Sequence, residues 1–438
     1  MTGRHRAMFG RSSHSLSSKA AGMLAVLATL VLAGGCDSQS AGLKADSVRV
    51  ASSHASTATS GPGSASARPT TVSGPAPGAM SIVASAPALA PNSVLNDIAV
   101  LDATHAWAVG GEGLSVPGGP GTAVVERWNG ATWSLMPMTG VSWPAGVQLT
   151  HVAADSPTDV WVVGQYALKP FAAVTVVAHF DGTAWHNVPF PDGTPAATRE
   201  ITGISVADGH VFLVGNLQLE QPILDEWNGV AWQRQRLPPQ CPSIFKGSGA
   251  HIAFCNFFAV KAFSPTDAWA SGNGALAGVM RPLLFHWNGS AWNVVQPGVD
   301  TGLQVQLTAI VGTSPDDMWA VGNRIDKAAT LVLHFNGATW SQVPWTSVSQ
   351  VEGAAVDGTG RLVVAERSPY KDDVALYADG KWTYFPAKVP SGAIRLDIPG
   401  VAVLPGSGTL FVAGYSTSPT TGDAPNPHHA VIERLGIA

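Results

Sequence analysis

Two cysteines near the middle of this 438-residue chain have a spacing that suits a covalent bond. Cys241 and Cys255 bound a loop of 15 residues. In an oxidising compartment, a bond across a loop of this length would stabilise the fold by about 3 kcal/mol, because it restricts the unfolded chain. We therefore predict a Cys241–Cys255 disulfide, and the alternative is a pair of buried thiols.

Three histidines recur at one position, each directly before an aromatic residue: His179, His286 and His334. Three imidazoles form a zinc site only when they meet within a few Å of one ion. These three fall in different sequence repeats, and Arg127 and Glu226 hold the same position in two others. We therefore predict that they face solvent or a neighbouring repeat, and we expect no metal site.

No catalytic motif is evident in the sequence, which lacks a Gly-x-Ser-x-Gly elbow, a phosphate-binding loop and a Cys-x-x-Cys pair. We therefore name no catalytic residue and expect no cofactor. The net charge is −5 and only 12% of residues are charged, without a basic stripe. This charge pattern argues against nucleic acid as a partner.

The elements that must position any site repeat about every 50 residues. Seven related segments span 95–111, 149–165, 201–216, 257–273, 307–323, 351–367 and 398–415. Their alignment places one anchor residue in each: Trp107, Trp161, Phe212, Trp269, Trp319, Leu362 and Leu410, with Tyr377 at the histidine position of the sixth. Seven units of this length, built from short strands, indicate a β-propeller.

Each unit divides into four short strands. Asn-Gly or Asp-Gly separates the third strand from the fourth, as in "VVERWNGATWSLMPM" (124–138), and this dipeptide favours a tight hairpin. Thirteen of the 15 Trp residues occupy three recurring positions, which indicates packing; Trp143 and Trp345 are the exceptions. We predict an all-β, seven-bladed propeller of four-stranded antiparallel blades, preceded by a disordered tether.

The seventh unit ends without a fourth strand. The strand-like segment 80–86, "MSIVASA", lies just before the first unit. Because an incomplete blade would leave an unpaired edge, we predict that 80–86 pairs with 430–436 and closes the ring. The propeller would then span 80–438.

The first unit resembles a kelch repeat in "AWAVGGEG" followed by "VVERWNGATWSLMPM". The resemblance is to the central-domain propeller of galactose oxidase and implies the propeller fold across 93–438. A copper oxidase of that type would need two Tyr, two His and a Cys joined to Tyr. The five Tyr residues and two spare Cys show no matching motif.

The two ends of the predicted ring differ in their loops. Turns between first and second strands, and between third and fourth, are tight and share one end, while long, dissimilar loops share the other. Variable loops on a rigid scaffold usually carry binding. We predict a binding face there that includes Trp143, Tyr166, Lys169, Phe171, Arg199, Asn273, Arg324, Trp345, Arg367, Tyr370 and Tyr415.

The N-terminal segment has the composition of a secretory signal. A basic stretch precedes ten apolar residues (23–32) and then "AGGC" (33–36). The segment "VLAGGC" resembles a bacterial lipoprotein signal, which implies cleavage before Cys36 and acylation of that residue. A secretory peptide with a chance cysteine is the alternative.

Residues 37–79 are rich in Ser, Ala, Thr, Gly and Pro and lack aromatic residues. Such a segment buries too little apolar surface to order itself, so we expect a flexible spacer with a reach of roughly 35 Å. The predicted domains are thus a signal at 1–36, a linker at 37–79 and the propeller.

These features predict a monomeric propeller that is secreted and held by a lipid anchor on the outer face of the cell membrane. We expect a non-catalytic binding module for a protein or a glycan. The alternatives are a carbohydrate-active propeller enzyme and an envelope assembly factor.

Overall fold

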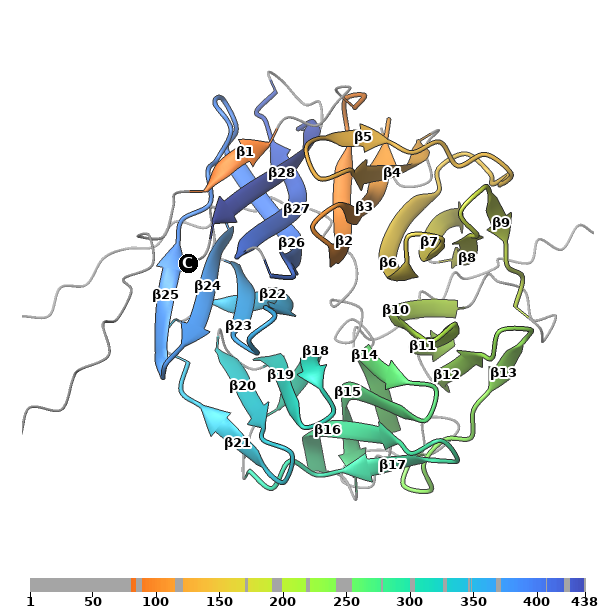
Figure 1. The fold of residues 1–438 in the computed structure, drawn as a ribbon, viewed down its shortest axis with the longest axis vertical. Coiled ribbons are helices and arrows are strands. Elements are labelled where there is room, and N and C mark those ends of the chain that lie inside the picture. The colour runs from red at the N-terminus through yellow and green to blue at the C-terminus, as the bar shows by residue number, and fades with distance from the viewer. Residues whose placement is uncertain are drawn as a thin grey trace, which may run out of the picture. The chain divides into compact units, whose positions relative to one another are not determined.

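A computed structural model describes residues 80–83, 89–114, 121–169, 172–190, 199–217, 221–241, 254–276, 279–299, 304–325, 329–345, 347, 349–367, 372–406, 408–420 and 426–436. Within these residues the chain forms seven four-stranded antiparallel sheets arranged as a ring (Figure 1). The predicted all-β, seven-bladed propeller is therefore confirmed. None of the described residues forms a helix that could cross a membrane.

Each blade uses four strands in order from the ring axis outward. Blades 1 to 3 comprise β2 (Val94–Asp102), β3 (His105–Glu112), β4 (Thr122–Trp128) and β5 (Trp133–Leu135); β6 (Gln148–Ser156), β7 (Asp159–Lys169), β8 (Ala172–Phe180) and β9 (Trp185–Asn187); and β10 (Arg199–Ala207), β11 (His210–Leu217), β12 (Gln221–Trp227) and β13 (Trp232–Arg234). Blades 4 and 5 comprise β14 (Phe254–Ser264), β15 (Asp267–Leu276), β16 (Val279–Trp287) and β17 (Trp292–Val295); and β18 (Val305–Ser314), β19 (Asp317–Arg324), β20 (Thr330–Phe335) and β21 (Trp340–Val343). Blades 6 and 7 comprise β22 (Gln350–Val356), β23 (Leu362–Arg367), β24 (Asp372–Ala378) and β25 (Lys381–Phe385); and β26 (Arg395–Leu404), β27 (Thr409–Thr417), β28 (His428–Gly436) and β1 (Ser81–Val83).

The ring closes through its N-terminal strand. Strand β1 pairs antiparallel with β28, with Ser81 opposite Arg434 and Val83 opposite Ile432. The pairing expected between the start of the propeller and its C-terminal strand is thus present at 81–83, while 84–86 lie outside the described residues. Blade 7 takes strands from both ends of the chain, so the circle of blades is complete.

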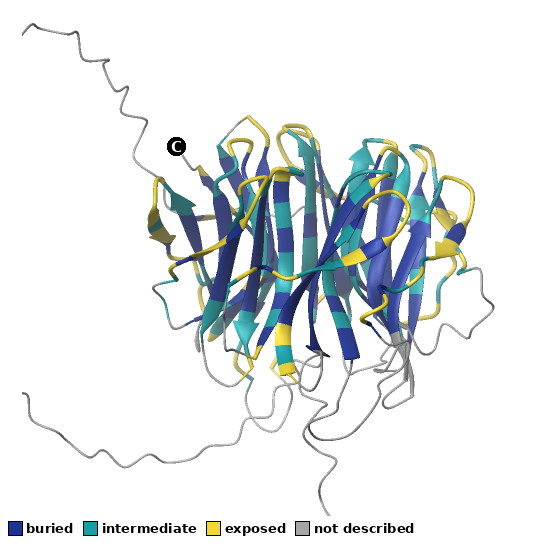
Figure 2. Cartoon of the chain, turned by 90° about the horizontal axis from the view of Figure 1, so that it is seen from below, coloured by how far each residue is buried: buried dark blue, intermediate teal, exposed yellow. Residues whose placement is uncertain are grey.

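The hydrophobic core is divided among the seven seams between neighbouring blades. One cluster of buried residues fills each seam, as in the cluster of Trp128, Trp133 and Phe411 between blades 7 and 1. Strands are buried along most of their length, and exposed residues gather in the turns (Figure 2). The recurring Trp residues therefore pack between blades, as their regular spacing predicts.

Two predicted anchors are displaced by one residue. Leu362 packs toward blade 5 and Leu410 toward blade 6, whereas the other anchors pack toward the next blade. Val363 and Phe411 occupy the anchor position instead, and Phe411 lies three residues before Gly414, as Trp107 does before Gly110. In the sixth unit, the position that corresponds to the recurring histidines is therefore Leu376, which pairs with Val363; the predicted residue, Tyr377, is wrong by one position. The error arose because these two units lack the anchor Trp.

Polar side chains fasten adjacent blades at the end where the innermost strands begin. Each bonds a backbone group of the next blade's innermost strand: Asn96 to Leu149 O at 2.6 Å, Thr202 to Phe257 O at 2.8 Å, Ser271 to Leu307 O at 3.0 Å, Asn323 to Val351 O at 2.7 Å and Asp372 to Ile398 N at 2.9 Å. These bonds satisfy backbone groups that the blade ladders leave free, because the innermost strand has no strand partner on its axial side.

Candidate functional site

The two ends of the ring are built from different turns, although some connections at the long-loop end are shorter than predicted: β7 runs to Lys169 and β8 starts at Ala172, so most of the predicted 164–174 loop is strand. At the tight-turn end, Asn129 Oδ1 accepts the N–H groups of Ala131 and Thr132, both at 2.9 Å, and Gly130 adopts a φ of 95° beside Thr104. The same arrangement recurs at Asn228, Asn288 and Asn336. These turns use their polar groups internally, which leaves the long-loop end as the more varied surface.

A set of polar residues, here named the polar belt, lies at the long-loop end of six blades. Each blade contributes one cross-strand pair from its first and second strands. The pairs are Gln148 with Gln165, Glu200 with Asn216, Asn256 with Asn273, Gln306 with Asn323, Gln350 with Arg367, and Asp397 with Tyr415. Blade 1 has Val94 and Gly111 in these places.

The belt changes character between blades 5 and 6. Blades 2 to 5 carry seven amides and one carboxylate in the belt, whereas blades 6 and 7 carry one amide, Gln350, together with Arg367, Asp397 and Tyr415. Because the blades share one scaffold, each one serves as a control for the others. The departure from the repeated pattern marks blades 6 and 7 as the part of the long-loop end with its own chemistry.

A charged network joins these two blades. Arg367 Nη1 lies 2.6 Å from Glu352 Oε1, and Arg395 Nε lies 2.8 Å from both carboxylate oxygens of Asp397. Both guanidiniums remain partly open, with 33% of the Arg367 side chain and 29% of the Arg395 side chain exposed. A guanidinium fixed at one edge by a carboxylate can still donate to a ligand from its other nitrogens.

Asp372 lies beneath this network and crosses the seam. Its Oδ2 accepts the N–H of Ile398, and its Oδ1 has no hydrogen-bond partner among the described residues. Burial, with smaller contributions from the charges of Asp397 and Glu352, raises the pKa of Asp372 to about 7 against the lowering effects of the Ile398 N–H bond and of Arg395. With Asp372 protonated, two guanidiniums balance two carboxylates, so the network is close to neutral.

Tyr415 and His428 complete the network on blade 7. Burial raises the pKa of the Tyr415 hydroxyl to about 12, with a smaller contribution from Asp397, so this group stays a neutral donor. The two rings meet edge to face, with centroids 5.0 Å apart, and His428 Nδ1 lies 3.1 Å from Thr417 Oγ1. Burial also lowers the pKa of His428, which favours the neutral imidazole.

The structure brings Arg367 and Tyr415 into this network, but it places other predicted residues elsewhere. Asn273 is 1% exposed and belongs to the belt of blade 4, where Asn256 Nδ2 donates to it at 3.2 Å. Tyr166 and Arg324 lie one residue beyond the belt in blades 2 and 5. These residues share one end of the ring without forming one cluster.

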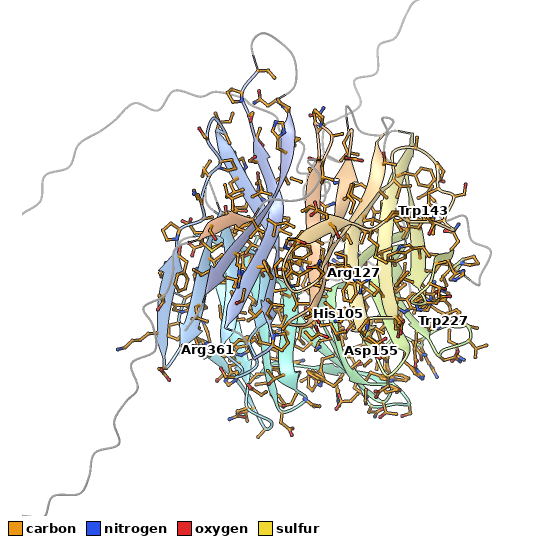
Figure 3. The ribbon with its side chains drawn as sticks, turned by 45° about the horizontal axis from the view of Figure 1, so that its top comes forward. His105, Arg127, Trp143, Asp155, Trp227 and Arg361 are labelled. Carbon is orange, nitrogen blue, oxygen red and sulfur yellow. A yellow bond between two sulfur atoms is a disulfide. The ribbon has the colours of Figure 1, made fainter. Side chains whose placement is uncertain are left out.

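The two Trp residues that break the repeat pack on the outer wall of the ring. Trp143 Nε1 donates to Asn187 in β9, the outermost strand of blade 2 (Figure 3). The Trp345 ring meets Trp382 of β25 at 4.5 Å, edge to face, in the same relation to blade 6. Both therefore cover the next blade's outermost strand and lie apart from the network.

The remaining predicted face residues fall outside what the structure describes. Phe171 and Tyr370 are not described, and Lys169 and Arg199 are described only as members of strands β7 and β10. Their part in a binding face stays a prediction.

Sequence reasoning missed Glu352, Asp372, Arg395 and Asp397. All four lie within strands rather than in the long loops where the search was made. Strand register could have identified two of them, because Asp372 and Asp397 are the cross-strand neighbours of the predicted residues Arg367 and Tyr415.

The recurring histidines form pairs with acids in their own blades. His179, His286 and His334 lie 2.8, 3.1 and 2.8 Å from Asp159, Asp267 and Asp317, and each ring stacks on the anchor Trp at 4.1–4.4 Å. In blade 3 the acid and the histidine exchange positions: His210 begins the second strand and bonds Glu226 of the third strand at 2.8 Å. Among the described residues, no group of three or more side chains could hold a metal ion.

Cys241 and Cys255 form the predicted disulfide, with an S–S distance of 2.06 Å and Cα atoms 5.4 Å apart. Both cysteines are buried against Phe257 and Leu237 of the seam between blades 3 and 4. Cys36 lies outside the described residues.

No protein-family model matches this chain, and no curated protein is similar to it in sequence. Among solved structures, YCF48 from Cyanidioschyzon merolae is 15% identical, with a TM-score of 0.50 and coverage of 81% of this chain and 98% of that one. This similarity supports the propeller fold.

Two further structures are similar at lower scores. YCF48 bound to D1 peptide is 15% identical, with a TM-score of 0.48 over 82% of this chain and 97% of that one. A virginiamycin B lyase from Staphylococcus aureus, an inactive variant with quinupristin, is 11% identical, with a TM-score of 0.48 over 82% and 99%. Similarity of fold by itself does not select a function.

Proposed function

We propose that this protein is an extracytoplasmic, lipid-anchored binding module without catalytic activity, and that its protein or glycan ligand contacts the long-loop end at blades 6 and 7. The observation that carries the proposal is the charged network, where Arg367 and Arg395 are held by carboxylates and still partly exposed. Fixed guanidiniums beside a neutral Tyr suit recognition of a polar ligand, because little side-chain entropy is lost on binding.

The location rests on two separate supports. The Cys241–Cys255 disulfide is typical of an oxidising compartment. The sequence "VLAGGC" (31–36) supports acylation at Cys36. Replacing this residue, Cys36→Ser, is expected to move the protein from the membrane fraction to the soluble fraction, as measured by detergent phase partitioning. If the variant stays membrane-bound, the lipid-anchor proposal fails.

Two arginines with similar exposure, each paired with one carboxylate, allow a matched test of the binding end. Arg367 is 33% exposed beside Glu352 at the long-loop end, and Arg361 is 28% exposed beside Asp357 at the tight-turn end. Ligands captured from envelope extract, and glycans bound on an array, are measured for the wild type, Arg367→Ala and Arg361→Ala. We expect at least a tenfold loss for Arg367→Ala alone; equal binding by both variants would contradict the proposal.

A carbohydrate-active enzyme is the second candidate. Asp372 favours it, because a carboxyl whose pKa lies near 7 can act as a general acid. Its burial and its bond to Ile398 favour a structural part instead, since only 1% of the residue is exposed. Release of reducing sugar from a bound glycan, lost in Asp372→Asn, would support the enzyme and contradict the non-catalytic proposal.

A further inference from the structure

One position on the innermost strands separates blades 1 and 2 from the other five. Each innermost strand has a β-bulge near the long-loop end, where the pairing with the second strand skips at least one residue, and the position in question is the first paired residue after this bulge. Five blades have glycine or alanine there: Gly203, Ala259, Ala309, Gly353 and Gly400. Blades 1 and 2 carry Asp97 and His151 there. Two neighbouring blades thus have ionisable residues at a position that is glycine or alanine in the other five.

The small residues have a steric reason. A Cβ at Gly353 would lie 2.3 Å from Pro399 O, and one at Gly400 would lie 3.2 Å from the backbone of Asp97. Neighbouring blades therefore approach each other closely at this position. Placing a carboxylate and an imidazole at such a point costs free energy through desolvation, and no ladder or core contact of the repeat requires it.

Both side chains are held by backbone groups. Asp97 Oδ1 accepts the N–H of Ile98 at 2.8 Å, and Asp97 Oδ2 accepts the N–H of Val152 at 3.0 Å. His151 bonds the backbone of Ile201 and places its Nδ1 3.8 Å from Asp97 Oδ2. The pair therefore has a fixed geometry that spans the first two seams.

The pair remains accessible although protein surrounds it. The Asp97 side chain is 30% exposed and the His151 side chain 27% exposed. Because β2 and β6 are the innermost strands of their blades, this accessible surface borders the ring axis (Figure 1). A ligand at the axial side of blades 1 and 2 would meet these two groups.

The charge state of the pair limits the ligand. Burial raises the pKa of Asp97 to about 7 and lowers the pKa of His151 to about 4, so between these values both groups are mainly neutral. A neutral carboxyl and a neutral imidazole each offer one donor and at least one acceptor. A hydroxyl group has the same two capacities and carries no charge.

We propose that Asp97 and His151 form a hydrogen-bonding site for a hydroxyl group of a neutral sugar that contacts blades 1 and 2 on their axial side. This inference rests on the proposed binding function and selects a glycan over a protein as its ligand. The amide-rich belt of blades 2 to 5 surrounds the same end of the ring and offers further neutral donors and acceptors.

The test uses the full chain on an array of neutral and acidic glycans. The variants Asp97→Ala, which introduces the residue that blades 4 and 5 carry at this position, and His151→Asn are compared with His105→Asn at the tight-turn end. The His105 side chain is 26% exposed and is also bound to an aspartate. Thermal unfolding first verifies that each variant is folded. We expect the wild type to bind neutral glycans, with at least a tenfold loss in both site variants and none in His105→Asn.

The outcomes separate this inference from the proposed function. If the wild type captures a protein and no glycan, and Arg367→Ala loses that capture, the binding function stands and the sugar site fails. Neutral glycan binding that is unchanged in both site variants also overturns the site. If the wild type binds neither glycan nor protein, both proposals fail.

Discussion

Three blades carry an acid at the same buried place on their third strand, and the partners of these acids differ. Asp225 bonds Arg234, and Glu433 accepts the backbone N–H of Lys388. Glu126 is 0% exposed, and neither of its carboxylate oxygens has a partner among the described residues. It lies in the seam between blades 7 and 1, where Arg434 is the charged side chain on the facing side of β28 and is exposed. Glu126 is therefore a buried acid that folding does not compensate.

Glu126 is expected to make stability fall as pH rises. Burial raises its pKa from 4.5 to about 7, so the folded chain keeps a proton that the unfolded chain loses near pH 4.5. The free energy of unfolding then decreases between about pH 4.5 and 7, by about 3 kcal/mol. The substitution Glu126→Gln should raise the melting temperature at pH 8 and leave it nearly unchanged at pH 5.

Asp225→Asn is the comparison for this measurement. It removes a carboxylate that Arg234 compensates, so it should lower the melting temperature at pH 8. If Glu126→Gln gives the same pH profile as the wild type, Glu126 does not ionise in the seam as described.

Secondary structure elements of this chain were predictable where each unit carries its own signal. The Asn-Gly turns and the Trp spacing predict the blades, because both act over a few residues. Units six and seven lack the anchor Trp, and there the predicted register was one residue off, at Leu362 and Leu410. Asp372 and Arg395 could not be brought together from sequence, because their contact depends on how two blades pack across a seam.

Closure by β1 gives a prediction at the level of one strand. Removing residues 1–88 deletes β1 and leaves the edge of β28 unpaired, whereas removing 1–71 retains it. We expect the shorter chain to unfold at a lower temperature and to self-associate, because an open strand edge pairs with other chains. Thermal unfolding and size-exclusion chromatography measure both effects. Equal behaviour of the two truncated chains would show that β1 is dispensable for closure.

The whole molecule is a repeated scaffold with local exceptions. Seven seams divide the core among equivalent Trp and aliphatic positions, so stability does not depend on one centre. The exceptions to the repeat gather at the long-loop end: the charged network of blades 6 and 7, and the Asp97–His151 pair of blades 1 and 2. In the ring these four blades are consecutive, since blade 7 adjoins blade 1. The central claim is that the ligand binds over this sector.

Hydrogen–deuterium exchange of the full chain, with and without envelope extract, tests this claim most directly. We predict slower exchange at the long-loop ends of β2, β6, β22, β26 and β27 in the presence of extract, with the Asn-Gly turns of blades 3 to 5 unchanged. Protection confined to the tight-turn end would contradict the account, as would exchange that extract leaves the same throughout the ring.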